Sequence, residues 1–93
     1  MTAPRLFATL KVGSVEAPNR LWMPPMCQYS AAPAGDGLGR PTDWHILHYG
    51  ARALGGVGAV IVEATGVLPE GRISVGCLSL HDDSRIPDFA RLA

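Results

Sequence analysis

The sequence predicts an α/β fold in which two successive βα units contribute strands to a parallel sheet. Three observations support this prediction. The predicted elements follow the order strand, loop, helix, buried strand, loop, helix; residues 57–62 form a nearly unbroken apolar run rich in β-branched side chains; and apolar residues recur at spacings of three and four in the helical segments. Two parallel strands cannot close a core by themselves. We therefore expect further chain, or a second copy, to complete the sheet.

The first half of the chain predicts a hairpin, a strand and a long loop. Two short alternating segments within 10–17 flank Gly13-Ser14, a turn dipeptide, which indicates a β-hairpin. A compact apolar strand over 20–23 ends at Pro24-Pro25, because proline has no N–H to give to a sheet. Residues 26–41 show neither helical nor strand periodicity. Loops of this length are often functional, so we consider this one a candidate site.

The second half predicts helix, strand, loop and helix. Thr42 or Asp43 can cap the first helix, which Gly55-Gly56 ends before the buried strand 57–62. A loop follows over 65–81, and the next helix starts near Asp82-Asp83 and Pro87, with one apolar face. The side chains expected on the buried face of the first helix are Trp44, Leu47, Ala51 and Leu54, and those of the second are Ile86, Phe89, Ala90 and Ala93.

The composition is that of a globular protein and excludes several classes of partner. Of the 93 residues, 47% are hydrophobic and 17% are charged, so the chain is not disordered. Eight basic and eight acidic residues cancel, and no net field favours nucleic acid or an anionic membrane surface. No apolar run approaches the roughly 20 residues of a membrane span, and no secretory signal is evident. We expect a cytoplasmic protein with neither nucleic acid nor membrane as partner.

The cysteines and histidines do not predict a metal site. Cys27 and Cys77 lack zinc-site spacing and are expected to be free thiols. His45 and His48 lie within one helical turn, but no nearby acid or cysteine completes a set of three ligands. We predict packed or interface histidines and no metal.

Three further residues, Glu63, Arg72 and Trp44, carry open alternatives. Glu63, at the carboxyl end of the buried strand, is a base, a ribose ligand or a structural partner, and we favour the last because buried carboxylates are normally paired. The arginines expected to pair with it are Arg20 or Arg52. Arg72 is either solvated or a loop anchor, and Trp22 is expected in the core. Trp44 is expected in the core or at a subunit interface.

The segment 24–30 follows the first strand, at the edge where parallel α/β proteins place their ligand chemistry. One interpretation of Cys27 is a small buried hydrophobe. The other requires Cys27 and Tyr29 to converge on a ligand, where the sulfur would contact a conjugated ring and the phenol would donate to a carbonyl oxygen.

A set of short motifs, each weak alone, is specific in its order and spacing. The motifs are Leu6-Phe7, Asn19-Arg20, Pro25-Met26-Cys27-Gln28-Tyr29, Asp43-Trp44-His45, His48-Tyr49, Gly55-Gly56-Val57-Gly58, Ile61-Val62-Glu63-Ala64-Thr65 and Pro69-Glu70-Gly71-Arg72-Ile73. Together they resemble the old yellow enzymes, which are FMN-dependent ene-reductases. The cysteine motif is similar to that of the branch containing the xenobiotic reductases and the thermophilic-like members, whereas relatives have threonine there.

The resemblance implies a TIM (β/α)8 barrel with FMN at the carboxyl ends of its strands. NAD(P)H would reduce the flavin, which would pass hydride to the C=C bond of an α,β-unsaturated carbonyl or nitro compound. In that family Pro25, Met26, Cys27 and Ala64 would bind the flavin. Cys27 would also tune its potential and touch the substrate, and Tyr29 would bind the substrate carbonyl. These two residues are the predicted catalytic and substrate-binding pair.

The length sets a limit on what these residues do alone. A TIM barrel needs about 250 residues, so we expect residues 1–93 to be the N-terminal part of one FMN-binding domain: the hairpin and first two βα units, truncated and inactive alone. The resemblance implies a homodimer or homotetramer at full length. The alternatives are a non-catalytic fragment that persists by association, and the N-terminal part of a longer flavoenzyme similar to dienoyl-CoA reductases.

Overall fold

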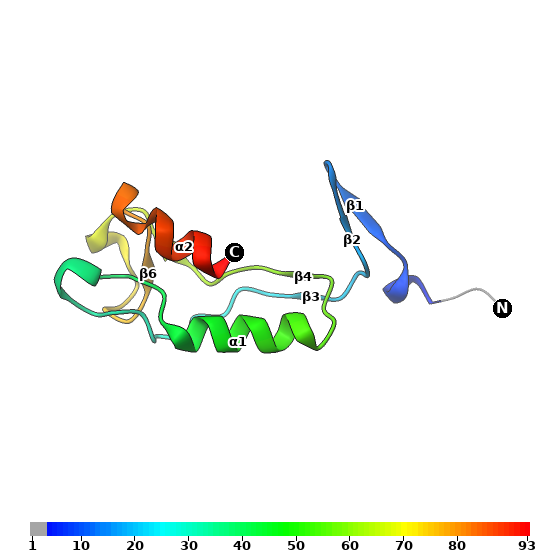
Figure 1. Ribbon diagram of the computed structural model, residues 1–93, viewed down its shortest axis with the longest axis horizontal. Helices are drawn as coiled ribbons and strands as arrows, with labels where there is room; N and C mark the ends of the chain where they lie inside the picture. Colours follow the sequence, from blue (N-terminus) through cyan, green and yellow to red (C-terminus); the bar gives the residue numbers. More distant parts are fainter. Residues whose placement is uncertain (1–3) are drawn as a thin grey trace.

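The computed structural model describes residues 4–93, which form an elongated body of 57 × 24 × 21 Å. At one end stands an antiparallel hairpin of β1 (Leu10–Val12) and β2 (Val15–Ala17), apart from the helices (Figure 1). Gly13 adopts a φ of 60° in the turn, a conformation that glycine takes without steric cost. The predicted hairpin is confirmed.

The first parallel pair is built by β3 (Trp22–Met23) and β4 (Ala59–Val60), connected through α1 (Asp43–Leu54). Trp22 lies opposite Ala59, and Met23 lies opposite Val60. The predicted βαβ order is therefore confirmed, but the strand expected over 57–62 is regular only at Ala59–Val60. Ile61 and Val62 are exposed because β3 is the only strand partner of β4 among the described residues. The expected burial on both faces is not achieved within these residues.

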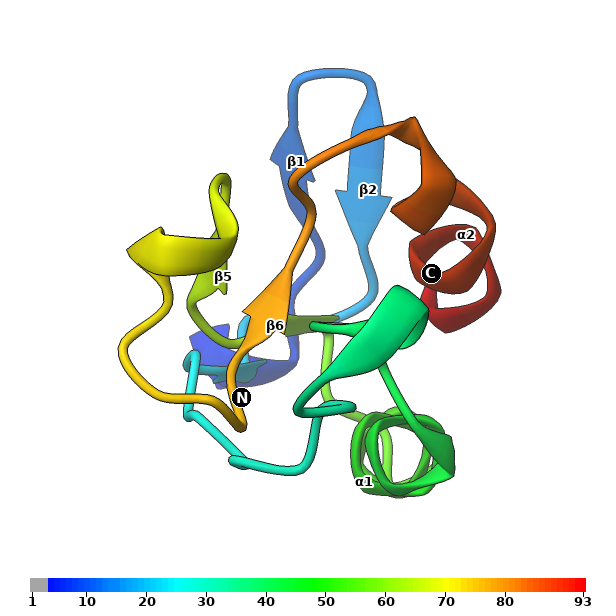
Figure 2. The same ribbon diagram turned by 90° about the vertical axis from the view of Figure 1, so that its left-hand side faces the viewer.

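A second parallel pair lies within the segment predicted to be a loop. β5 (Thr65–Gly66) pairs with β6 (Leu78–Ser79), and a 3-10 turn at Pro69–Gly71 lies between them in the chain. Viewed from the end, α1 and the second helix lie on one side of β6, and the turn lies on the other (Figure 2). Leu78 and Ser79 are fully buried. Strands of two residues have too little periodicity for the sequence to reveal them.

The helix boundaries agree with the predicted caps. Thr42 is the N-cap of α1, and its backbone N–H donates to Nδ1 of His45 at 2.9 Å. The helix ends before Gly56, whose φ is +102°. A 3-10 turn at Asp83–Arg85 leads into α2 (Ile86–Leu92), and the Asp82 side chain accepts from the Ser84 backbone N–H at 2.8 Å. No helix in the described part of the chain is long and apolar enough to cross a membrane.

The buried face of α1 is not the predicted one. Trp44, Leu47 and Leu54 are 50%, 69% and 91% exposed, whereas His45 and Tyr49 are buried. The inward face carries these polar side chains because a buried carboxyl group from the end of β4 faces them. The face that apolar spacing predicted to be buried is therefore the outer, exposed face of the helix. Trp22, predicted in the core, is also partly exposed.

Candidate functional site

The predicted flavin residues come from two segments that leave the same edge of the sheet. Pro25, Met26 and Cys27 follow β3, and Ala64 follows β4, its parallel neighbour. Pro25, Met26 and Ala64 are exposed, and Cys27 is half-buried. Carboxyl ends of parallel strands are the usual ligand edge of α/β folds. The exposed side chains could therefore form one wall against a flat apolar ring.

Tyr29 lies in the same segment, but its side chain points mainly into solvent. It is 61% exposed, and its φ of 53° is unusual for a residue with a side chain. Its backbone lies against Gly76, where a Cβ would approach the Tyr29 carbonyl oxygen to 2.7 Å. Among the described residues no hydrogen bond joins the Tyr29 and Cys27 side chains, so their convergence on one ligand remains a prediction.

The loop 26–41 is tied to the second half of the chain. The backbone N–H of Ala31 donates to the Gly76 carbonyl at 3.0 Å, and that of Ser79 donates to the Gly39 carbonyl at 3.0 Å. The buried Arg85 side chain adds a third contact, donating to the Asp36 carbonyl at 2.9 Å. The candidate site loop is therefore held in place by the region around β6 and α2.

A buried carboxyl group lies where β4, α1 and the candidate loop meet. Glu63 is 3% exposed, and its Oε2 accepts a 2.5 Å hydrogen bond from the Tyr49 hydroxyl. The same hydroxyl accepts from the Glu63 backbone N–H at 3.0 Å, which closes a small ring. Oε1 accepts from the Gln28 backbone N–H at 3.4 Å and lies 3.4 Å from His45 Nε2. The sequence did not predict this network.

The expected arginine partners of Glu63 are wrong. Arg20 donates to the Thr9 carbonyl, and Arg52 donates to the His48 carbonyl one helical turn away. Both guanidinium groups belong to exposed residues, and Glu63 points inward. The Tyr49 hydroxyl, a donor on the inner face of α1, takes the place that we had assigned to a cation.

Hydrogen bonding fixes which groups carry protons in this network. Burial, and then the hydrogen bond with Glu63, raise the pKa of Tyr49 far above its ordinary value, so the phenol stays protonated and donates. His45 Nδ1 accepts from the Thr42 backbone N–H, which leaves the ring proton on Nε2, facing Glu63. His45 is fully buried, as predicted for a packed histidine.

His48 and Trp44 form a second contact between α1 and the candidate loop. Their rings stack at 5.9 Å with 16° between planes, and Trp44 Nε1 donates to Gln28 Oε1 at 3.1 Å. Burial, and then the nearby Arg52, lower the pKa of His48. No group of three potential metal ligands occurs within residues 4–93.

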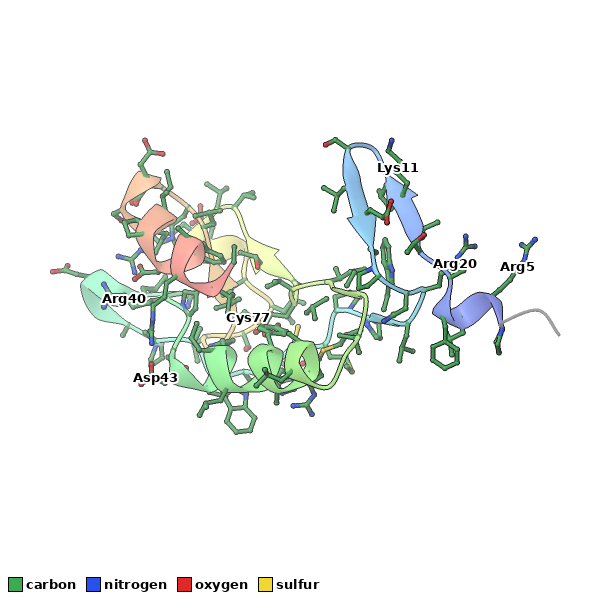
Figure 3. All side chains as sticks on the ribbon, turned by 45° about the vertical axis from the view of Figure 1, so that its right-hand side comes forward. Arg5, Lys11, Arg20, Arg40, Asp43 and Cys77 are labelled. Atoms are coloured by element: carbon green, nitrogen blue, oxygen red, sulfur yellow. The ribbon has the colours of Figure 1, made fainter. Side chains whose placement is uncertain are left out.

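Cys77 and Arg72 organise the neighbouring loop. Arg72 Nε donates to the Pro69 carbonyl at 2.7 Å and Nη1 to the Val75 carbonyl at 3.1 Å, so it is a loop anchor. Cys77 lies inside the body of the molecule, away from the hairpin (Figure 3). Its hydrogen bond with Ser74 is the main cause of a lowered pKa.

One arrangement in the structure resembles a nucleophile triad but is structural. Ser79 Oγ lies 2.9 Å from His81 Nδ1, and His81 Nε2 lies 3.6 Å from Asp82 Oδ2. Ser79 is fully buried, and its hydroxyl is within 3.4 Å of the Gly66 carbonyl, to which it donates. A nucleophile must reach its substrate, so we assign Ser79 to the packing of β5 against β6.

Neither the groove beside α1 nor the hollow beside Ala64 in residues 4–93 forms a flavin pocket by itself. A 410 Å³ groove lies between α1, β4 and α2, lined by Ile46, Tyr49, Gly50, Ala53, Val60, Val62, Arg91, Leu92 and Ala93. It includes neither residues 25–29 nor Ala64. The hollow beside Ala64 holds only 60 Å³, whereas sites for small molecules span about 300–1,000 Å³. Position at the strand ends, rather than volume, therefore identifies the candidate site.

The fold and the site edge define part of a parallel α/β barrel with a ligand face at the strand ends. Residues 5–93 match the model of the NADH:flavin oxidoreductase / NADH oxidase family, and the chain belongs to this family. The solved structures that it resembles are old yellow enzymes, and its fold is that of the N-terminal hairpin and first βα units of their TIM barrel.

Three solved structures illustrate the similarity. Morphinone reductase is 28% identical, with a TM-score of 0.80 over 98% of this chain and 22% of that chain. The old yellow enzyme from Trypanosoma cruzi is 26% identical, with a TM-score of 0.83 over 96% of this chain and 22% of that one. The old yellow enzyme homologue NCR from Zymomonas mobilis is 28% identical, with a TM-score of 0.81, covering 96% and 23%. The chain thus spans about a quarter of these relatives.

Proposed function

We propose that this chain forms the N-terminal part of an FMN-dependent ene-reductase that uses NAD(P)H. Its substrates would be small activated alkenes, namely α,β-unsaturated carbonyl or nitro compounds. The observation that carries the proposal is the placement of residues 25–29 and Ala64 at the carboxyl ends of two neighbouring parallel strands. A solved complex of morphinone reductase with tetrahydroNAD supports a nicotinamide as the reductant.

Bound FMN would supply hydride transfer, and the residues of this chain would orient the reaction. Pro25, Met26 and Ala64 would contact the ring, and the half-buried Cys27 thiol would touch both ring and substrate. The exposed Tyr29 phenol would donate a hydrogen bond to the substrate carbonyl. A donor at the oxygen where enolate charge develops stabilises the transition state more than the ground state.

The activity that we propose belongs to a completed barrel. Each described strand has a single partner, and the hollow beside Ala64 is too small for a flavin, so residues 1–93 alone would neither hold FMN nor turn over. Small-molecule substrates, a homodimeric or homotetrameric assembly and a cytoplasmic location complete the proposal. Nucleic acid and membrane have no part in it.

The test is the visible absorption spectrum of the protein that carries this chain, followed by anaerobic reduction with NADPH and reoxidation by cyclohexenone. We expect flavin bands that bleach with NADPH and return with the enone. Cys27→Ala is expected to shift the flavin reduction potential and the alkene selectivity. A protein that stays colourless after addition of FMN and desalting would favour a non-catalytic fragment instead.

A further inference from the structure

We propose that Glu63 is a positioning residue for the segment that carries Cys27. Its carboxyl group, fixed by Tyr49 on α1, holds the backbone N–H of Gln28 and so sets where the neighbouring thiol lies. The proposal rests on the proposed function, because only a flavin or substrate at this edge gives the position of Cys27 a catalytic consequence.

The position of Glu63 depends on the inner face of α1. Oε2 receives the Tyr49 hydroxyl at 2.5 Å, and the Glu63 backbone N–H returns a 3.0 Å hydrogen bond to the same hydroxyl oxygen. The Tyr49 hydroxyl therefore holds Glu63 through both its carboxyl group and its backbone N–H. His45 Nε2 lies 3.4 Å from the other oxygen and closes that side of the site. With 3% of Glu63 exposed, water competes little for these bonds.

The loop is attached to this fixed group through a main-chain atom. Gln28 donates its backbone N–H to Glu63 Oε1 at 3.4 Å, a long hydrogen bond to a group that already has partners. Because the peptide unit between residues 27 and 28 is planar, orienting this N–H also orients the Cys27 carbonyl and the direction of its Cα. The contact therefore restrains the backbone from which the thiol projects.

The Gln28 side chain strengthens the same attachment. Its Oε1 accepts from Trp44 Nε1 at 3.1 Å, and its Nε2 donates to the Met26 carbonyl at 3.0 Å. Gln28 is thus bound to α1 twice, through Trp44 and through Glu63 with Tyr49. The bond to Met26 spans Cys27 and closes the segment on itself. Cys27 therefore lies inside a small loop whose two ends, Met26 and Gln28, are joined by this hydrogen bond.

The decisive experiment is a double-mutant cycle between Glu63 and Cys27 in the flavoprotein. Glu63→Gln keeps the size of the side chain but replaces one carboxyl oxygen by an NH₂ group. We expect kcat/KM for an enone to fall about tenfold, the size expected for one lost hydrogen bond to a charged group, with a shift of the flavin potential. In a Cys27→Ala background the same change should have no further effect on either quantity. Glu70→Gln, at an exposed position, is the matched control.

The outcomes separate this proposal from the proposed function. Additive effects of the two substitutions, or an unchanged potential and kcat/KM in Glu63→Gln, would overturn the positioning role while the ene-reductase activity stands. If Glu63→Gln does not fold, Tyr49→Phe enters the same cycle and must show the same dependence on Cys27.

A separate measurement applies if the protein holds no flavin, which would defeat the proposed function. The alkylation rate of Cys27 by iodoacetamide, identified by peptide mass spectrometry and distinguished from Cys77, then decides the inference. A rise of about tenfold in Glu63→Gln, again the size of one lost charge-assisted hydrogen bond, supports a segment held by this carboxyl group. An unchanged rate overturns it.

Discussion

Replacing Tyr49 by phenylalanine removes one oxygen atom from the buried polar cluster of Glu63, His45 and Tyr49. The ring still fills its space, so no cavity forms, and the effect isolates the hydroxyl. Two contacts disappear together: the donation to Glu63 Oε2 at 2.5 Å and the acceptance from the Glu63 backbone N–H at 3.0 Å. The Glu63 carboxyl group and its main-chain N–H are then left buried with fewer partners.

The expected loss of free energy of unfolding follows from the loss of these two hydrogen bonds. A hydrogen bond to a charged group contributes about 1.5–3 kcal/mol, and a buried donor left without a partner costs about 1–3 kcal/mol. Because the two share one hydroxyl and the site can relax, we expect Tyr49→Phe to lower the free energy of unfolding by about 3 kcal/mol. Urea denaturation followed by circular dichroism measures this as a lower midpoint at constant m-value.

The chain offers a matched control for this substitution. Tyr29→Phe is the same chemical change at a side chain that is 61% exposed, and surface changes of this kind alter stability by less than about 0.5 kcal/mol. If Tyr49→Phe costs no more than Tyr29→Phe, the hydroxyl does not hold Glu63 and the description of the network is wrong.

Three further predictions address activity, packing and pH. Tyr29→Phe should lower kcat/KM for an enone about a hundredfold, as loss of one oxyanion donor does, and unchanged steady-state kinetics would contradict its role. Gly58→Ala should lower Tm and destabilise by about 1–3 kcal/mol, since a Cβ there would lie 2.6 Å from Asn19 Oδ1 and also meet the Asn19 carbonyl; an unaltered Tm would exclude the clash. For His48, whose pKa is lowered from 6.5, the unfolded chain binds the proton more tightly, so stability should fall as pH drops below 6.5 towards the lowered value. His48→Gln should flatten that part of the pH profile of the urea midpoint, and a profile identical to wild type would refute the assignment.

Local signals in the sequence predicted the elements whose boundaries depend on neighbouring residues. The turn at Gly13-Ser14, the Thr42 cap and the stop at Gly56 each act through backbone conformation or a nearby hydrogen bond. The pair β5 and β6 depends instead on contacts between residues 13 apart, Thr65 with Leu78 and Gly66 with Ser79. No periodicity over two residues reveals such a pairing.

The candidate site shows the same division. The carboxyl ends of β3 and β4 could be located from strand order, because parallel neighbours share an edge. The partner of Glu63 could not be predicted from strand order, because it depends on which face of α1 turns inward. Hydrophobic spacing favoured the face with Trp44, whereas the buried face carries His45 and Tyr49, four residues apart. One signal in the sequence could have indicated this buried face. His45 and Tyr49 are hydrogen-bonding side chains at helical spacing, and the acid Glu63 follows the next strand.

The contacts between the candidate loop and the β6 region affect how this site can be engineered. Gly76 leaves room for the Tyr29 backbone, and the Ala31 N–H and Gly39 carbonyl pair with residues on the other side of the contact. Consider a chimaera that takes residues 26–41 from a relative and keeps residues 67–80 of this chain. Its two contacting segments would come from different proteins and would not have evolved to fit each other. Exchanging both segments together preserves their fit, so recombination libraries of this family should treat them as a single block.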